Sequence, residues 1–87
     1  MRVWLAPHLC FNGVEIDLIM LREIYYLVEV KTLRNFDEMS FRVSRKQLMR
    51  LGYARQAYED CLNQLVALKI AFVTKKEVIL VDRNDLN

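Results

Sequence analysis

Few side chains in this sequence have the types and spacing that catalysis or metal binding requires. The one histidine, His8, stands alone, and Cys10 and Cys61 lie far apart with no Cys-x-x-Cys pair. Because structural zinc usually takes four Cys or His ligands, the sequence predicts no metal site. We interpret both cysteines as buried thiols in a reducing cytoplasm, which is the expected location of the protein.

Acidic residues are the other candidates for chemistry. Glu15, Asp17, Glu23 and Glu29 all lie within residues 14–33, a segment whose composition favours one long helix. We interpret these carboxylates as solvated charges on the surface of that helix. Since the sequence also has no Gly-rich phosphate loop and no Ser-His or Cys-His constellation, it predicts neither an enzyme nor a cofactor.

The predicted helix at residues 14–33 is apolar around most of its circumference. A helix covered this widely must pack on more than one side. We expect one side to meet the rest of the domain and another to meet a second subunit, giving a homodimer through this long first helix. The alternative is a helix enclosed within the monomer by an amino-terminal strand, because Val3 and Leu5 alternate as a short strand does.

The length of the chain and its charge distribution limit its class. It has 87 residues, which suggests a single domain over residues 1–87, and a net charge of +2. Residues 31–56 hold seven basic and two acidic side chains, a net +5, so the rest of the chain carries −3. Such a concentration of cations suits contacts to phosphate. No uncharged apolar run reaches about 18 residues and no signal peptide is visible, so we expect no membrane segment.

The carboxy-terminal half predicts two helices joined by a tight turn. Ser44 and Gln47 form an S-x-x-Q capping box, which predicts a short helix over residues 45–51. Gly52 can supply a left-handed turn without strain, and a second helix is expected over residues 54–68.

Strands are expected on either side of these helices. Residues 39–43 alternate as a short strand does, and residues 71–74 and 78–81 predict a hairpin around residues 75–77. Residues 1–12 form an extension or strand, and residues 82–87 a polar tail.

A helix, a tight turn, a longer helix and a hairpin in this order resemble the winged helix-turn-helix family. The resemblance covers residues 14–81 and implies an α+β fold with a long first helix, a short helix, a recognition helix and a C-terminal β-hairpin wing. It also implies that the supporting helix, the recognition helix and the wing contact DNA. The matching positions are Arg45, Lys46, Arg50, Tyr53, Arg55, Gln56, Glu59, Asn63, Lys75 and Lys76.

Two departures from this pattern bear on function. The recognition helix begins at Tyr53-Ala54-Arg55 without the usual Ser or Thr cap, at a cost of about 1 kcal/mol. Glu59 and Asp60 also place two negative charges on the surface that would face phosphate.

The resemblance implies sequence-specific binding of double-stranded DNA, and we expect a small dimeric transcriptional regulator whose affinity falls steeply with salt. A DNA-binding replication or partition protein of a plasmid or virus would use the same domain. The acidic pair favours a different alternative, in which a domain of the same fold docks a protein instead of DNA.

Overall fold

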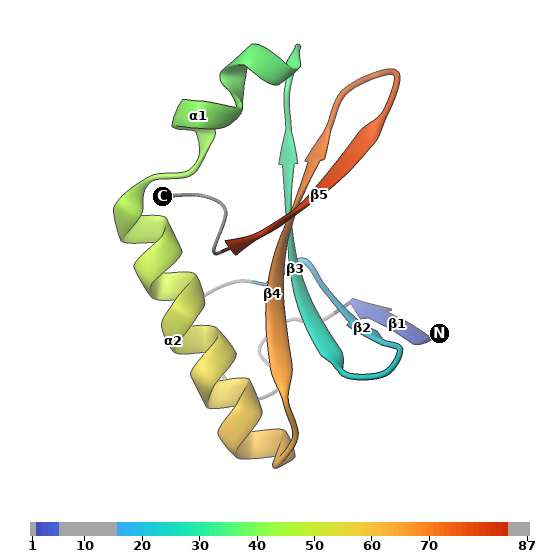
Figure 1. Cartoon of the computed structure of the whole chain (residues 1–87), viewed down its shortest axis with the longest axis vertical. Helices are drawn as coiled ribbons and strands as arrows, with labels where there is room; N and C mark the ends of the chain where they lie inside the picture. The colour runs from blue at the N-terminus through green and yellow to red at the C-terminus, as the bar shows by residue number, and fades with distance from the viewer. Residues whose placement is uncertain (1, 6–15, 84–87) are drawn as a thin grey trace.

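A five-stranded sheet with one long helix packed along it forms the framework of this chain (Figure 1). The computed structural model describes residues 2–5 and 16–83. Its elements in chain order are β1 (Arg2–Leu5), β2 (Leu18–Leu21), β3 (Tyr25–Thr32), the 3-10 turn η1 (Phe36–Glu38), α1 (Met39–Arg42), α2 (Arg45–Leu62), β4 (Val66–Val73) and β5 (Val78–Asp82).

The strands lie in the order β1-β2-β3-β4-β5, so neighbours in space are also neighbours in sequence. Strands β1, β2 and β3 form an antiparallel meander, and β4 and β5 form an antiparallel hairpin. The central pair, β3 and β4, is parallel, with Tyr25 opposite Val66 and Thr32 opposite Val73. Because parallel neighbours need a crossover connection, η1, α1 and α2 together provide the link between them.

The core lies between α2 and one face of this sheet. Side chains alternate across a strand, so every second residue of β3 and β4 points toward the helix. Leu51, Ala54 and Tyr58 of α2 pack against that face, and all three are almost fully buried. The strand residues that they meet are Ile19, Leu27, Val66, Leu68, Ile70 and Phe72.

The opposite face of the sheet is more exposed in the described part of the chain. Val3, Val30, Val78 and Leu80 each keep more than a third of their surface accessible there. The Lys69 side chain also lies on this face, and its ammonium forms an ion pair with Asp82 Oδ1 at 2.6 Å.

The predicted long helix over residues 14–33 is wrong, because the described residues of that segment form β2, a turn and β3. The apolar residues were interpreted as helical, but Tyr, Val and Thr, which fit a pleated sheet, dominate the sequence of β3. Pairing with β4, which lies far along the chain, stabilises the strand. The predicted homodimer interface, which was this long first helix, is therefore wrong as well.

The helix-turn-helix is wrong as well, and with it the winged helix fold, which needs three helices. Helix α2 continues through Gly52, and no described glycine has a positive φ. Glycine inside a helix costs about 1 kcal/mol relative to alanine, which the packing of Leu51, Ala54 and Tyr58 outweighs. The left-handed residue is Asn63, with φ 53°, where α2 ends.

Other local predictions had mixed outcomes. The predicted strand at residues 39–43 is wrong, because Met39–Arg42 form α1. The hairpin predicted at residues 71–74 and 78–81 is present as β4 and β5, but β4 begins at Val66, so the helix predicted over residues 54–68 ends too late. Ser44 caps α2 as predicted, since its Oγ accepts a hydrogen bond from the Gln47 amide at 3.1 Å. The short strand that includes Val3 is confirmed as β1, and it pairs with β2.

Two further observations concern cysteine and membrane segments. Cys61 is exposed and disulfide-bonded, so its interpretation as a buried thiol is wrong. Cys10, His8 and most of the predicted extension lie outside the described residues. No described helix combines the length and the apolar character that crossing a bilayer requires.

Candidate functional site

An aspartate at the start of β2 is held against the neighbouring strand β3. Asp17 Oδ2 accepts a hydrogen bond of 2.7 Å from the amide of Val30. The recorded antiparallel pairs of β2 and β3 end at Leu18 and Val28, so Asp17 and Glu29 are the next residues on the two sides. Asp17 itself precedes the first residue of β2, and its carboxylate turns toward the backbone of β3. The Asp17 carboxylate thus lies beside the segment of β3 that contains Glu29.

A lysine joins these carboxylates from the same strand. Lys31 follows Glu29 by two residues on β3, so both side chains share the face to which the buried Leu27 belongs. Lys31 Nζ lies 3.9 Å from Glu29 Oε1. Only 17% of the Lys31 side chain and 12% of the Glu29 side chain are exposed. The helix-facing side of the central strand thus carries two recessed charges where apolar residues would be expected.

The backbone of β3 adds a further oxygen to this cluster. The amides of Tyr25 and Leu33 donate to Leu65 and Val73 on the β4 side. The amide of Val30 instead donates toward Asp17, on the β2 side. Since the N–H and C=O of a strand residue point the same way, the Val30 carbonyl also faces the β2 side, next to Asp17.

Carboxylate and carbonyl oxygens are the ligands that small, hard cations prefer. Like charges placed opposite one another on a sheet are destabilising, and Lys31 supplies one positive charge against the two carboxylates. Among residues 2–5 and 16–83, no three Asp, Glu, His or Cys side chains gather closely enough to enclose a metal ion unaided. Magnesium does not need such a cage, because it binds through one or two carboxylates and keeps water or phosphate as its other ligands.

The residues that the sequence predicted for DNA contact occupy two separate parts of the molecule. Arg45, Lys46, Arg50, Tyr53 and Gln56 are exposed on α2. Lys75 and Lys76 are exposed at the β4–β5 turn. This turn lies at the upper right in Figure 1, whereas α2 runs along the lower left. The predicted recognition surface is therefore divided between α2 and the hairpin.

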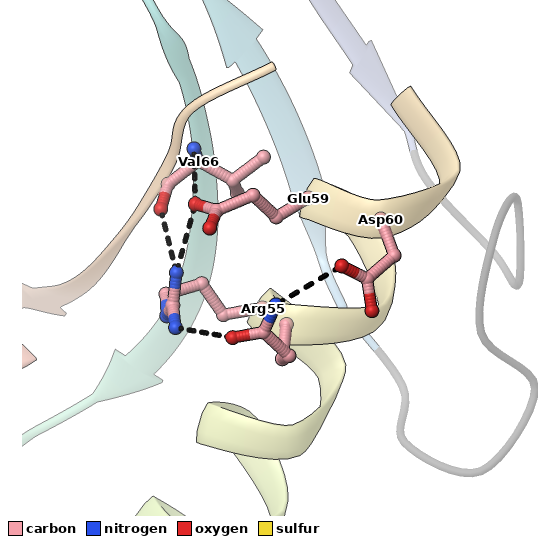
Figure 2. A network of polar contacts seen from close by, with 5 residues as sticks. Arg55, Glu59, Asp60 and Val66 are labelled. Carbon is pink, nitrogen blue, oxygen red and sulfur yellow. Dashed lines mark hydrogen bonds and ion pairs between the residues drawn. The ribbon is translucent and has the colours of Figure 1, made fainter. Parts of the chain in front are cut away.

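The remaining predicted residues hold the fold together. Arg55 Nη1 donates to Glu59 Oε2 at 3.0 Å and to the Val66 carbonyl at 3.3 Å, while the Val66 amide donates to Glu59 Oε2 at 3.0 Å (Figure 2). This network joins the last turns of α2 to the first residue of β4. Asn63 ends α2 in the left-handed conformation. The acidic residue Glu59, interpreted as part of an acidic patch, is thus a partner of Arg55.

Sequence reasoning missed Asp17, Glu29 and Lys31 as a group because it assigned them to a helix. One signal was available in residues 28–32, Val-Glu-Val-Lys-Thr, where charged and β-branched residues alternate with a period of two. That alternation is typical of a strand and would have placed Glu29 and Lys31 on one face.

No protein-family model, curated protein or solved structure matches the chain.

Proposed function

We propose that this chain is a divalent-metal-dependent hydrolase of phosphodiester bonds in nucleic acid. In this proposal Asp17 and Glu29 would hold Mg²⁺, and Lys31 would contact the phosphate that is cleaved. The observation that carries the proposal is the 2.7 Å hydrogen bond from the Val30 amide to Asp17, which holds one carboxylate beside the Glu29-Val30-Lys31 segment of β3.

The type of ligand supports magnesium as the metal. Carboxylate and carbonyl oxygens are the ligands that Mg²⁺ and Mn²⁺ prefer, whereas zinc prefers nitrogen and sulfur. Asp17, Glu29 and the Val30 carbonyl provide three such oxygens, and the substrate phosphate and water would complete the coordination. When bound, the metal polarises the phosphoryl oxygen and lowers the pKa of a bound water molecule.

The position of Lys31 supports a role toward the same phosphate. Its ammonium group lies within 4 Å of Glu29, so a phosphate that meets the metal also meets this cation. Hydrolysis of a phosphodiester builds negative charge on the phosphoryl oxygens, and a cation fixed in advance stabilises that charge most strongly where water is excluded. The small exposed fraction of the Lys31 side chain, 17%, meets that condition.

The charge of the segment that follows the site in the sequence supports nucleic acid as the substrate. Residues 31–56 carry a net +5 from seven basic and two acidic side chains, and this segment begins at Lys31 itself. A chain of phosphates needs several cations along its path, whereas a small phosphate ester does not. Double-stranded DNA, the partner expected from the sequence, remains the proposed substrate.

A cleavage assay tests this proposal. Purified full-length chain is incubated with end-labelled duplex DNA, single-stranded DNA and RNA, with Mg²⁺, Mn²⁺ or EDTA. We expect cleavage of duplex DNA that needs the metal, and a loss of about a hundredfold or more in the variants Asp17→Asn and Glu29→Gln. Asp60→Asn is the matched control, because this exposed carboxylate accepts a hydrogen bond from Gln56 on α2. Failure to cleave any of the three substrates with either metal would refute the proposal, as would wild-type rates in both site variants.

A second candidate is binding of double-stranded DNA without cleavage, as in a transcriptional regulator. The exposed cations Arg45, Lys46 and Arg50 of α2 favour it. Within residues 2–5 and 16–83, ion pairs form at Arg34, Arg55 and Lys69 and not at these three positions. In the same assay this candidate predicts salt-dependent binding with an intact substrate. Charge reversal at these three positions would then abolish binding, while Asp17→Asn would leave binding unchanged.

A further inference from the structure

A cleft lies at the end of β3, immediately beyond the candidate site. It has a volume of about 980 Å³ and lies between the β3–α1 connection and the β4–β5 turn. Thr32, the residue after Lys31, forms part of its lining, so the cleft begins where the sequence of the candidate site ends. We call it the hairpin cleft; its polar lining includes Thr32, Arg34, Arg42, Thr74, Lys75 and Lys76.

Positive charge prevails in the hairpin cleft. Four cations line it, Arg34 and Arg42 on one wall and Lys75 and Lys76 on the other, against the two carboxylates Glu38 and Glu77. The Arg34 side chain is 92% exposed, and its ion pair with Glu38 is long, at 3.9 Å. Opposing walls that both carry cations suit an anion that passes between them.

The wall formed by the β3–α1 connection is fixed by its own hydrogen bonds. The Arg34 amide donates to Glu38 Oε1 at 2.7 Å, and the Asp37 amide donates to Asn35 Oδ1 at 3.0 Å. The first of these bonds lowers the pKa of Glu38, so its carboxylate stays charged and keeps the turn closed. Arg42 Nη2 donates to the Thr32 carbonyl at 3.3 Å, which holds this guanidinium at the cleft.

The wall formed by the hairpin is fixed in a similar way. Thr74 Oγ1 accepts hydrogen bonds from the amides of Lys76 and Glu77, each at 3.3 Å. The Thr74 amide in turn donates to the Glu77 carbonyl at 3.0 Å. The two lysines are therefore presented on an ordered turn, which reduces the entropy lost when they bind a ligand.

We propose that the hairpin cleft binds the sugar–phosphate backbone of duplex DNA that extends from the hydrolytic site. The proposal rests on the proposed function, because it takes the same substrate one step farther along the protein. Proteins that hold single strands stack bases on exposed aromatic rings. Phe36, the aromatic residue of the cleft lining, packs against the core instead, so the cleft offers cations without a stacking surface.

The experiment compares two double variants of equal charge change. Lys75→Ala/Lys76→Ala removes two cations from the cleft. Arg2→Ala/Arg22→Ala removes two exposed cations from the opposite end of the sheet, where Arg2 pairs with Leu21 beside Arg22. Binding of a labelled duplex is measured by fluorescence anisotropy in EDTA over a range of salt concentrations, with single-stranded DNA as a second arm.

We expect the cleft variant to bind the duplex on the order of tenfold more weakly than wild type. The slope of log K against log salt concentration should fall in magnitude by about 1.5 to 2. The control variant should keep the affinity and the slope of wild type. Equal slopes and affinities in the two variants would overturn the proposal. A larger loss for single strands than for the duplex would overturn the choice of ligand. If thermal unfolding shows that the cleft variant is destabilised, Lys75→Gln/Lys76→Gln must reproduce the loss.

The binding and cleavage measurements separate this inference from the proposed function. Selective loss of binding in the cleft variant, in a protein that never cleaves DNA, would support the cleft and refute the hydrolase. Metal-dependent cleavage with the same KM in both double variants would support the hydrolase and refute the cleft.

Discussion

The amide of Val30 donates a 2.7 Å hydrogen bond to the Asp17 carboxylate, joining residues thirteen positions apart in the sequence. This contact lies where β2 begins, beyond the last paired residues Leu18 and Val28. Asp17 therefore takes the place of a backbone partner for β3 while keeping its second oxygen. One side chain both satisfies a backbone amide of β3 and carries a charge beside the Glu29-Val30-Lys31 segment.

The two roles of Asp17 can be separated by substitution. An asparagine keeps an oxygen that can accept the hydrogen bond from the Val30 amide. The free energy of unfolding of Asp17→Asn should therefore lie within about 1 kcal/mol of the wild-type value. Asp17→Ala leaves the Val30 amide without this partner and should lose about 1–3 kcal/mol. Urea unfolding measures the difference. If both variants were equally stable, the hydrogen bond would have no structural role, and a hydrolytic defect shared by both would then be electrostatic alone.

Lys31 should act on the rate of hydrolysis and not on the fold. Lys31→Met keeps an apolar stem of similar length, so we expect kcat to fall on the order of a hundredfold with a smaller change in KM. The control is Lys69→Met on β4, because Lys69 belongs to the opposite face of the sheet and pairs with Asp82. Steady-state cleavage kinetics on duplex DNA provide both constants. Equal kcat values in the two variants would remove Lys31 from the site.

Gly52 distinguishes the continuous helix from a helix-turn-helix. A Cβ added there would lie 3.8 Å from Arg83 Nε, an ordinary contact. Gly52→Ala should therefore stabilise the protein by about 0.5–1 kcal/mol and raise Tm by roughly 2–8 °C. At the left-handed Asn63, substitution by alanine should instead cost about 1 kcal/mol. Differential scanning calorimetry reports both, and a destabilised Gly52→Ala would contradict the helix.

Glu59 should contribute more to stability than its neighbour Asp60. Glu59 Oε2 accepts from both Arg55 and the Val66 amide, so Glu59→Ala leaves the Val66 amide without this acceptor and removes the ion pair of Arg55. We expect a loss of about 1–3 kcal/mol. Asp60→Ala removes only an exposed contact with Gln56 and should stay within about 0.5 kcal/mol. Chemical denaturation of the two variants provides the comparison, and similar losses would show that the network is dispensable.

Glu38 should make stability depend on acid pH. The Arg34 amide lowers the pKa of Glu38 by bonding its charged form, so the unfolded chain takes up a proton at a higher pH than the folded one. The contribution is therefore complete above the ordinary carboxyl pKa and is lost as pH falls through the lowered value, in the range below about pH 4. In urea unfolding at a series of pH values, Glu38→Gln should reduce this dependence. An unchanged pH profile would show that the turn at Arg34 does not depend on this charge.

The sequence alone determined the features that depend on neighbouring residues. Ser44 and Gln47 specify the start of α2, and the residues around Thr74 and Glu77 specify a turn between two strands, because caps and turns are formed by groups a few bonds apart. The concentration of cations from Lys31 to Arg55 could also be counted directly. These predictions needed no knowledge of the fold.

Only the tertiary structure decided what these local elements become. Residues 18–32 have an apolar pattern that is compatible with either a helix or buried strands, and the parallel pairing of β3 with β4 selects the strands. Once β3 is a strand, Glu29 and Lys31 share one face and Asp17 reaches Val30; in a helix the same residues would be spread around a solvated surface. Contacts between distant segments are what the sequence pattern does not contain, and the candidate site consists of such contacts.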